Sequence, residues 1–161
     1  MGTHTELHEQ DFYAWLEVTA GLLRAGKWQE IDALTLAEEL DAVRSQERRE
    51  ALRRLRRLMQ HLLKWQYQPA GRQTGHSWRS TIRTQRAALV DMLEESPSMA
   101  RELPTLLTKG YPLARQWASD DTHLPRATFP EACPWTPEQV LDTDFFPEPS
   151  GASMRRRGGT A

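Results

Sequence analysis

The sequence predicts an all-α protein: an irregular helical bundle with one long helix at about residues 32–68 and a helix-poor, proline-rich C-terminal wrap. Apolar residues recur every three or four positions from residue 11 to about residue 121, which is the period of an amphipathic helix. No segment shows the alternation of apolar and polar residues that predicts a half-buried strand. Four prolines between residues 125 and 137 then interrupt the helical pattern.

Length and composition indicate a single domain. The chain has 161 residues, of which 39% are hydrophobic and 27% charged, and this suits one core. We expect a flexible N-terminus over residues 1–10, one helical domain over 11–146 and a disordered basic tail over 147–161. The sequence has a lone cysteine, no leader pattern and no apolar run of about 20 residues, so we expect a cytoplasmic protein without a membrane partner.

The ends of the first two predicted helices are marked by capping residues. Asp11 is the expected N-cap of the first helix, and Gly26 is its expected stop. Asp32 opens the long helix, which contains neither glycine nor proline before Pro69. Such a length exceeds that of most globular helices, so a kink near Ser45 is an alternative to one continuous helix.

The next helices follow a loop rich in glycine over residues 69–76. Ser77 is the expected N-cap of a third helix that runs through residue 95. Pro97 suits the first turn of a new helix, and Pro104 and Pro112 predict that this region is a short helix followed by another. Thr136 is the expected cap of one last short helix, which ends at residue 141.

Several segments resemble one known family. They are residues 11–16 (DFYAWL), 36–40 (LAEEL), 47–50 (ERRE), 61–69 (HLLKWQYQP), 77–79 (SWR), 81–83 (TIR), 133–136 (CPWT) and 144–148 (DFFPE). In this order, over roughly residues 9–148, the chain is similar to the domain of unknown function 29 family, which is common in cyanobacteria and other bacteria. The resemblance implies an all-helical fold and supplies no catalytic residue to carry over.

The net charge of −1 conceals a strong asymmetry along the chain. Residues 1–43 carry 2 basic and 9 acidic side chains, a net charge of −7, whereas residues 44–90 carry 12 basic and 2 acidic ones, a net charge of +10. Residues 91–161 carry 7 basic and 11 acidic side chains, which adds −4. The basic middle is either a patch for an anionic partner or a strip that the acidic ends of the chain neutralise.

Three charged residues of the long helix lie on its apolar stripe. Arg44, Glu47 and Arg48 share this stripe with Leu40 and Ala51. Because buried charge is costly unless it is paired, three interpretations stay open. The residues form an ionic site with the glutamate as base or ligand and the arginines as an anion clamp; or they are exposed to water at a helix extension or kink; or they form a buried ion pair that fixes helix register.

A second candidate group lies at the two ends of the loop over residues 69–76. If the flanking helices are antiparallel, the loop brings together His61, Lys64, Trp65, Trp78, Arg79 and Arg83. Histidine and arginines beside aromatic rings can bind phosphate or stack a nucleic-acid base. Alternatively, the two tryptophans close the end of the bundle and the histidine satisfies loop carbonyls. We expect both of these tryptophans, and Trp15, to be largely buried.

Arginines also recur at helical spacing in two sets. Arg49, Arg53 and Arg56 form one set, and Arg79, Arg83 and Arg86 form the other. Such stripes could follow a nucleic-acid backbone. A solvated face paired with glutamates of the same chain is the alternative, because the pI is about 6.5 and no known nucleic-acid-binding motif occurs in the sequence.

The sequence contains no recognisable catalytic or metal-binding motif, and we expect no catalytic residue, no metal and no cofactor. The leading interpretation is an interaction or scaffold module that binds a protein partner or forms a homodimer. A nucleic-acid- or phosphate-binding accessory protein that uses residues 44–86 is the first alternative. An enzyme of unrecognised type, which would use Glu47, His61 or the arginines, is the second.

Overall fold

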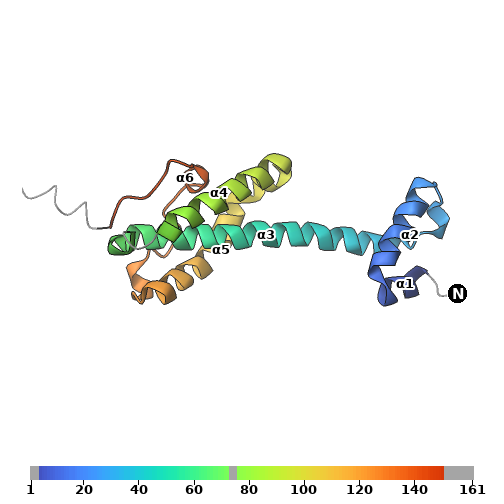
Figure 1. Ribbon diagram of the computed structural model, residues 1–161, viewed down its shortest axis with the longest axis horizontal. Helices are drawn as coiled ribbons and strands as arrows, with labels where there is room; N and C mark the ends of the chain where they lie inside the picture. The colour runs from blue at the N-terminus through green and yellow to red at the C-terminus, as the bar shows by residue number, and fades with distance from the viewer. Residues whose placement is uncertain (1–3, 73–75, 151–161) are drawn as a thin grey trace, which may run out of the picture. The chain divides into compact units, whose positions relative to one another are not determined.

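The computed structural model describes residues 4–72 and 76–150, and these residues form helices joined by turns and, after residue 122, by longer irregular segments, without a strand (Figure 1). The α-helices are α1 (His4–Gln10), α2 (Phe12–Arg24), α3 (Ala33–Tyr67), α4 (His76–Glu95), α5 (Pro97–Thr122) and α6 (Pro137–Leu141). Three 3₁₀ turns cover Trp28–Glu30, Pro69–Arg72 and Arg126–Thr128. The predicted all-α fold with one long helix and a C-terminal wrap is confirmed.

The chain forms two compact units, and the division falls within α3: the first unit ends at Glu47, and the second begins at Arg48. A compact unit need not fold on its own as a separate domain. The single domain expected over residues 11–146 therefore stays a prediction.

In the first unit, α2 and α3 begin as the sequence predicts. Asp11 Oδ1 accepts a hydrogen bond from the Ala14 amide at 3.0 Å. Gly26 has a φ of 68° just beyond the end of α2, a left-handed conformation that favours glycine. Asp32 caps α3, because its carboxylate accepts hydrogen bonds from the Thr35 amide at 3.2 Å and the Thr35 hydroxyl at 2.8 Å.

Residues 4–10, which were expected to be flexible, form α1. The Thr5 hydroxyl donates to Asp32 Oδ2 at 2.7 Å, and His8 Nε2 lies 2.6 Å from Glu39 Oε1. Hydrogen bonds from the Thr5 and Thr35 hydroxyls stabilise the carboxylate of Asp32 and lower its pKa to about 2. These contacts connect α1 to the first turns of α3.

The core of the second unit lies between α3, α4 and α5, with α4 and α5 alongside the C-terminal half of α3 in Figure 1. The buried apolar residues of these helices are Ala51, Leu52, Leu55, Leu58, Met59, Leu62 and Leu63 of α3, Ile82, Leu89 and Leu93 of α4, and Leu103, Leu106, Leu107, Tyr111, Ala114 and Ala118 of α5. Burying one leucine-sized side chain contributes about 1.5–3 kcal/mol, so this interface is the main source of stability in the unit.

The prediction that Pro104 and Pro112 separate two helices is wrong, because α5 runs continuously through both. A proline inside a helix removes one amide donor and displaces the carbonyl four residues earlier, here those of Ala100 and Thr108. Both prolines are exposed, so the disturbed backbone lies on the outer face of the helix. The opposite face packs into the core and holds the helix together.

Two other boundaries differ from the expectation. α3 is one helix through Ser45, and α4 begins at His76, so Ser77 lies in its first turn instead of capping it. Residues 151–161 of the expected tail lie outside the described residues. Among its described residues, Pro147 is buried and its carbonyl accepts a hydrogen bond from Arg72 Nη2 at 3.2 Å, whereas Glu148 and Ser150 are exposed.

Side chains of α5 hold the C-terminal wrap against the helices. The Tyr111 hydroxyl donates to the Pro130 carbonyl at 2.7 Å. Arg115 donates twice to the Phe129 carbonyl, from Nε at 3.1 Å and from Nη2 at 2.9 Å. A segment with this many prolines lacks regular backbone hydrogen bonds, so donors from the bundle fix its path. The wrap contains α6, which begins at the predicted Thr136 cap and is followed by residues 142–150.

Gly110 marks a close contact between α5 and α3. A Cβ at this position would lie 3.2 Å from both Leu52 Cδ1 and Met59 Cε. We expect Gly110→Val to lower the free energy of unfolding by about 1–3 kcal/mol, as overpacking does in a filled core. Gly21→Val is the control, because no atom lies within 4 Å of a Cβ there. Urea denaturation of both variants tests this, and equal stabilities would contradict it.

Candidate functional site

The two ends of the loop over residues 69–76 come together at Lys64 and Trp78. Lys64 lies in the last turn of α3, and Trp78 lies in the first turn of α4. Lys64 Nζ is 4.9 Å from the centroid of the Trp78 ring, within the range of a cation–π contact. The expected approach of these two helix ends is therefore present for this pair.

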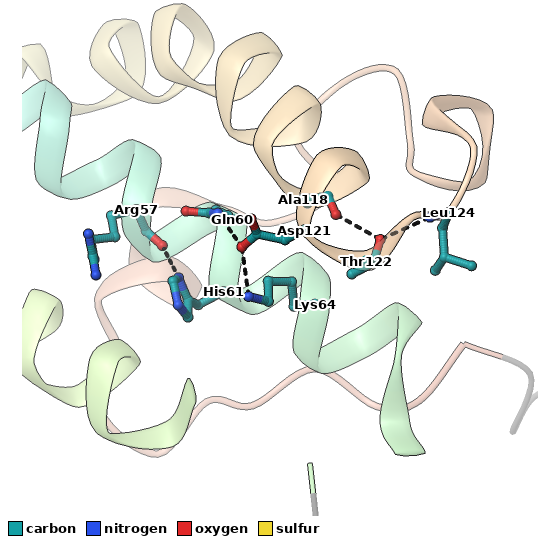
Figure 2. Close-up of polar contacts among 8 residues, drawn as sticks. All are labelled: Arg57, Gln60, His61, Lys64, Ala118, Asp121, Thr122 and Leu124. Atoms are coloured by element: carbon teal, nitrogen blue, oxygen red, sulfur yellow. Dashed lines mark hydrogen bonds and ion pairs between the residues drawn. The ribbon is translucent and has the colours of Figure 1, made fainter. Parts of the chain in front are cut away.

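A polar cluster beside this contact joins α3 to α5 (Figure 2). Asp121 Oδ2 accepts hydrogen bonds from Gln60 Nε2 and Lys64 Nζ, each at 2.8 Å. The Lys64 side chain is only 10% exposed, whereas that of Asp121 is 44% exposed. The ammonium is thus the buried member of the pair, and the carboxylate reaches solvent. Sequence reasoning missed Asp121, because nothing local in the sequence indicates which distant lysine it faces.

His61 lies in the same turn of α3 and is buried. Its Nδ1 lies 2.8 Å from the Arg57 carbonyl, as Figure 2 shows. Since a carbonyl only accepts, Nδ1 carries the proton and Nε2 is left as an acceptor. Burial lowers the pKa of His61 from its ordinary 6.5, and the neighbouring charge of Lys64 lowers it further, although the bond to Arg57 opposes the shift. A neutral histidine that satisfies a carbonyl supports the structural interpretation over a phosphate-binding one.

Trp65 takes part in a different contact. Arg72 Cζ lies 4.4 Å from the Trp65 ring centroid, and the Phe146 ring centroid lies 5.0 Å from it. Arg79 Cζ is 5.2 Å from the Phe146 ring. Arg83 is exposed, and its side chain makes no hydrogen bond or ion pair within residues 4–72 and 77–150. Lys64 and Trp78 thus contact each other, and Trp65 and Arg79 both contact Phe146, so members of this candidate group are engaged with other side chains of the protein.

The predicted burial is confirmed for Trp15, which is fully buried, and Trp65 and Trp78 are each partly buried. Both lie where α3 and α4 meet their connecting loop, and Trp65 packs against the edge of the apolar core. Cationic side chains also cover part of each ring: that of Arg72 lies over Trp65, and that of Lys64 lies over Trp78.

The three charges on the α3 stripe do not form a buried pair. Arg44 and Glu47 are exposed. Arg48 Nε donates to Glu102 Oε2 of α5 at 2.8 Å, in a pair whose side chains are 37% and 35% exposed. The physical reason is that the buried face of α3 begins only at Ala51, so the preceding charges lie outside the core.

Arg86 is a buried charge. The prediction that it shares an exposed stripe with Arg79 and Arg83 is wrong, because its side chain is 0% exposed. Arg86 follows Ile82 by four residues and precedes Leu89 by three, which places it on the buried face of α4. The spacing of Arg86 from these two apolar residues in the sequence therefore indicates its burial.

The Arg86 guanidinium binds the backbone of α6. Nε donates to the Val140 carbonyl at 2.8 Å, and Nη2 donates to the Gln139 carbonyl at 3.4 Å. Cζ lies 5.3 Å from the Phe146 ring. Burial lowers the pKa of Arg86, and the charge of Asp142 partly offsets this. Arg86 therefore supplies donors to carbonyls at the end of a helix, a role that anchors the wrap.

Cys133 also has a packing role. Its Sγ lies 4.0 Å from Met59 Sδ, and burial raises the pKa of the thiol, which keeps it protonated. Within the described part of the chain, no group of three or more His, Cys, Asp or Glu side chains is placed to hold a metal ion. Among the described helices, none has the length and apolarity needed to cross a membrane.

A family model described as "Domain of unknown function DUF29" matches residues 7–146. The chain belongs to the DUF29 family. The match includes residues of both compact units and confirms the resemblance noted in the sequence segments. No curated protein and no solved structure matches the chain.

The Lys64–Asp121 pair predicts unequal effects of removing either partner. Asp121→Asn leaves a buried ammonium without its carboxylate, and we expect it to lower the free energy of unfolding by about 1–3 kcal/mol. Lys64→Met fills the same space and leaves an aspartate that water already reaches, so we expect a smaller loss. Urea titrations of both variants measure this, and a larger loss for Lys64→Met would contradict the assignment.

His61 predicts a loss of stability in acid. Its folded pKa is lowered, so below pH 6.5 the unfolded chain binds a proton that the folded chain does not. The free energy of unfolding should fall as pH drops below 6.5, by at most about 1.4 kcal/mol per pH unit from this group. His61→Gln should remove this part of the pH dependence. His123→Asn, at an exposed position, is the control and should retain it.

Proposed function

We propose that this DUF29 protein is a helical interaction module that forms a homodimer through its N-terminal unit. The proposal rests on where the large hydrophobic side chains are exposed. Among the described residues, eight of the nine lie in the first unit: Phe12, Tyr13, Leu16, Val18, Trp28, Leu34, Leu40 and Val43. The ninth is Leu113 of α5. Concentrated exposed apolar residues are typical of interaction surfaces.

The first unit also buries little of its own chain. Between residues 4 and 47, only Trp15 and Thr19 are buried. On α3, Leu40 is 63% exposed and Val43 is 58% exposed, at the spacing of neighbours on one helix face. Covering such side chains would contribute about 25 cal/mol for each Å² removed from water. A partner thus supplies burial that this unit lacks.

Charge favours a second copy of the chain as that partner. Residues 1–43 have a net charge of −7, and residues 44–90 have a net charge of +10. In a twofold dimer, the acidic N-terminal unit of each copy contacts exposed arginines of the basic segment of the other, such as Arg49 and Arg83, so the favourable contact forms twice. A pairing of two acidic units would repel.

The nucleic-acid alternative over residues 44–86 has less support, because several of its cations already have partners. Arg86 is buried against α6, and Arg48 pairs with Glu102. Arg72 and Arg79 lie against the rings of aromatic residues. Fewer arginines are left for a continuous contact with a polyanion than the count in the sequence suggests.

Leu40→Gln together with Val43→Gln should disrupt the dimer. Light scattering after gel filtration at low salt should give the wild type a mass near twice the 18.6 kDa of one chain, and the double variant a mass near one chain. High salt should weaken the wild-type dimer, because it screens charge pairs. Leu113→Gln is the matched control, an exposed leucine of the second unit, and should leave the mass unchanged.

A wild type that stays monomeric at every protein concentration would overturn the homodimer. A double variant that remains dimeric would place the interface elsewhere. Circular dichroism of each variant establishes that the change in mass is not caused by unfolding.

A further inference from the structure

A polar pocket of about 330 Å³ lies between α3 and α4, within the second unit. Arg53, Arg54 and Arg57 line it from α3, and Ser80, Thr81 and Thr84 line it from α4. This volume is at the lower end of the range of about 300–1,000 Å³ found for small-molecule sites. We propose that the pocket binds the phosphate group of a small phosphorylated molecule.

The pocket carries a net positive charge. Glu50 also lines it, so three guanidinium groups and one carboxylate leave +2 at neutral pH. Glu50 pairs with both Arg53 and Arg54, and its Oε1 lies 2.8 Å from Arg54 Nε. The Arg57 guanidinium makes no hydrogen bond or ion pair within the described part of the chain. It is the cation of the pocket with its charge still available.

The pocket is lined by hydrogen-bond donors of Arg54, Thr81 and Thr84. Some of them are fixed by contacts with α4, and others have no acceptor among the residues that the structure describes. Arg54 Nη1 donates to Gln85 Oε1 at 3.3 Å, which ties this guanidinium to α4. Arg54 Nε is buried and has no well-aligned acceptor, although Glu50 lies close to it. The hydroxyls of Thr81 and Thr84 make no side-chain hydrogen bond within residues 4–72 and 77–150. Guanidinium and hydroxyl donors therefore converge on one cavity from two helices.

A phosphate monoester fits these donors better than other common anions. Its dianion balances the +2 of the pocket, and its three terminal oxygens accept hydrogen bonds from several directions. A carboxylate brings one charge and two coplanar oxygens, and each phosphodiester of a nucleic acid brings one charge along a chain. The pocket does not depend on the dimer proposed above, since α3 and α4 of one chain build it.

Calorimetric titration of the full chain with inorganic phosphate and with glycerol 3-phosphate tests the site. We expect binding above that seen in sodium chloride of equal ionic strength. Arg57→Gln should weaken it about 10- to 100-fold, as loss of a charged hydrogen bond does, and Thr84→Val should weaken it less. Arg101→Gln, at an exposed position of α5 outside the pocket, should bind as the wild type does. Binding should also weaken below about pH 6, where the monoester takes up a proton.

Unchanged binding in Arg57→Gln, or an equal response to chloride, would overturn the proposal. An oligonucleotide without terminal phosphates that binds through Arg57 as tightly as glycerol 3-phosphate would assign the site to a polyanion and overturn the small-molecule ligand. Arg57 is exposed, so its replacement should leave the helical dichroism and the melting temperature nearly unchanged.

Discussion

The change in burial along α3 is the constraint on which the rest of the structure depends. From Ala51 onward this helix presents a continuous buried face to α4 and α5, and before Ala51 none of its residues is buried. A helix segment without a buried apolar face is marginal in water, so the N-terminal half of α3 relies on its cap and on polar contacts with α1. The Asp32 cap, the Thr5 hydroxyl and the His8–Glu39 pair supply them. The same absence of a packed face leaves Leu40 and Val43 exposed.

The second unit completes its core with cations instead of apolar side chains alone. Arg86 donates to the Val140 carbonyl, Arg115 to the Phe129 carbonyl, and Lys64 to Asp121. These cations hold the wrap and the end of α5. Both elements have backbone or side-chain acceptors that regular secondary structure does not satisfy. A long basic side chain covers apolar surface with its stem and brings donors to such acceptors. Part of the basic content of the chain is therefore structural.

Most of the fold could be predicted from local signals. Helix period and capping residues located α2, α3, α4 and α6 to within a residue or two, because Asp11, Asp32 and Thr136 act through bonds to their own neighbours. Pro104 and Pro112 led to a wrong prediction of two helices. Core packing on the other face of α5 outweighs the local cost of a proline inside a helix. The partners Asp121 and Glu102 were not predictable, because spacing fixes which residues share a helix face but not which faces of different helices meet.

Net charge alone could not sort the basic residues, whereas their positions on the helix faces distinguish them. Arg86 and Arg57 contribute equally to the net charge. Arg86 is nevertheless buried and bound to α6, whereas Arg57 is exposed at a cavity. What separates them is position relative to the buried stripe of each helix. Arg86 lies on the stripe of α4, whereas Arg57 lies off the stripe of α3 that contains Leu55 and Leu58. A cation on a buried stripe must find carbonyl or carboxylate partners within the protein. A cation beside the stripe is free of that requirement, and it is there, between α3 and α4, that this chain keeps donors for a ligand.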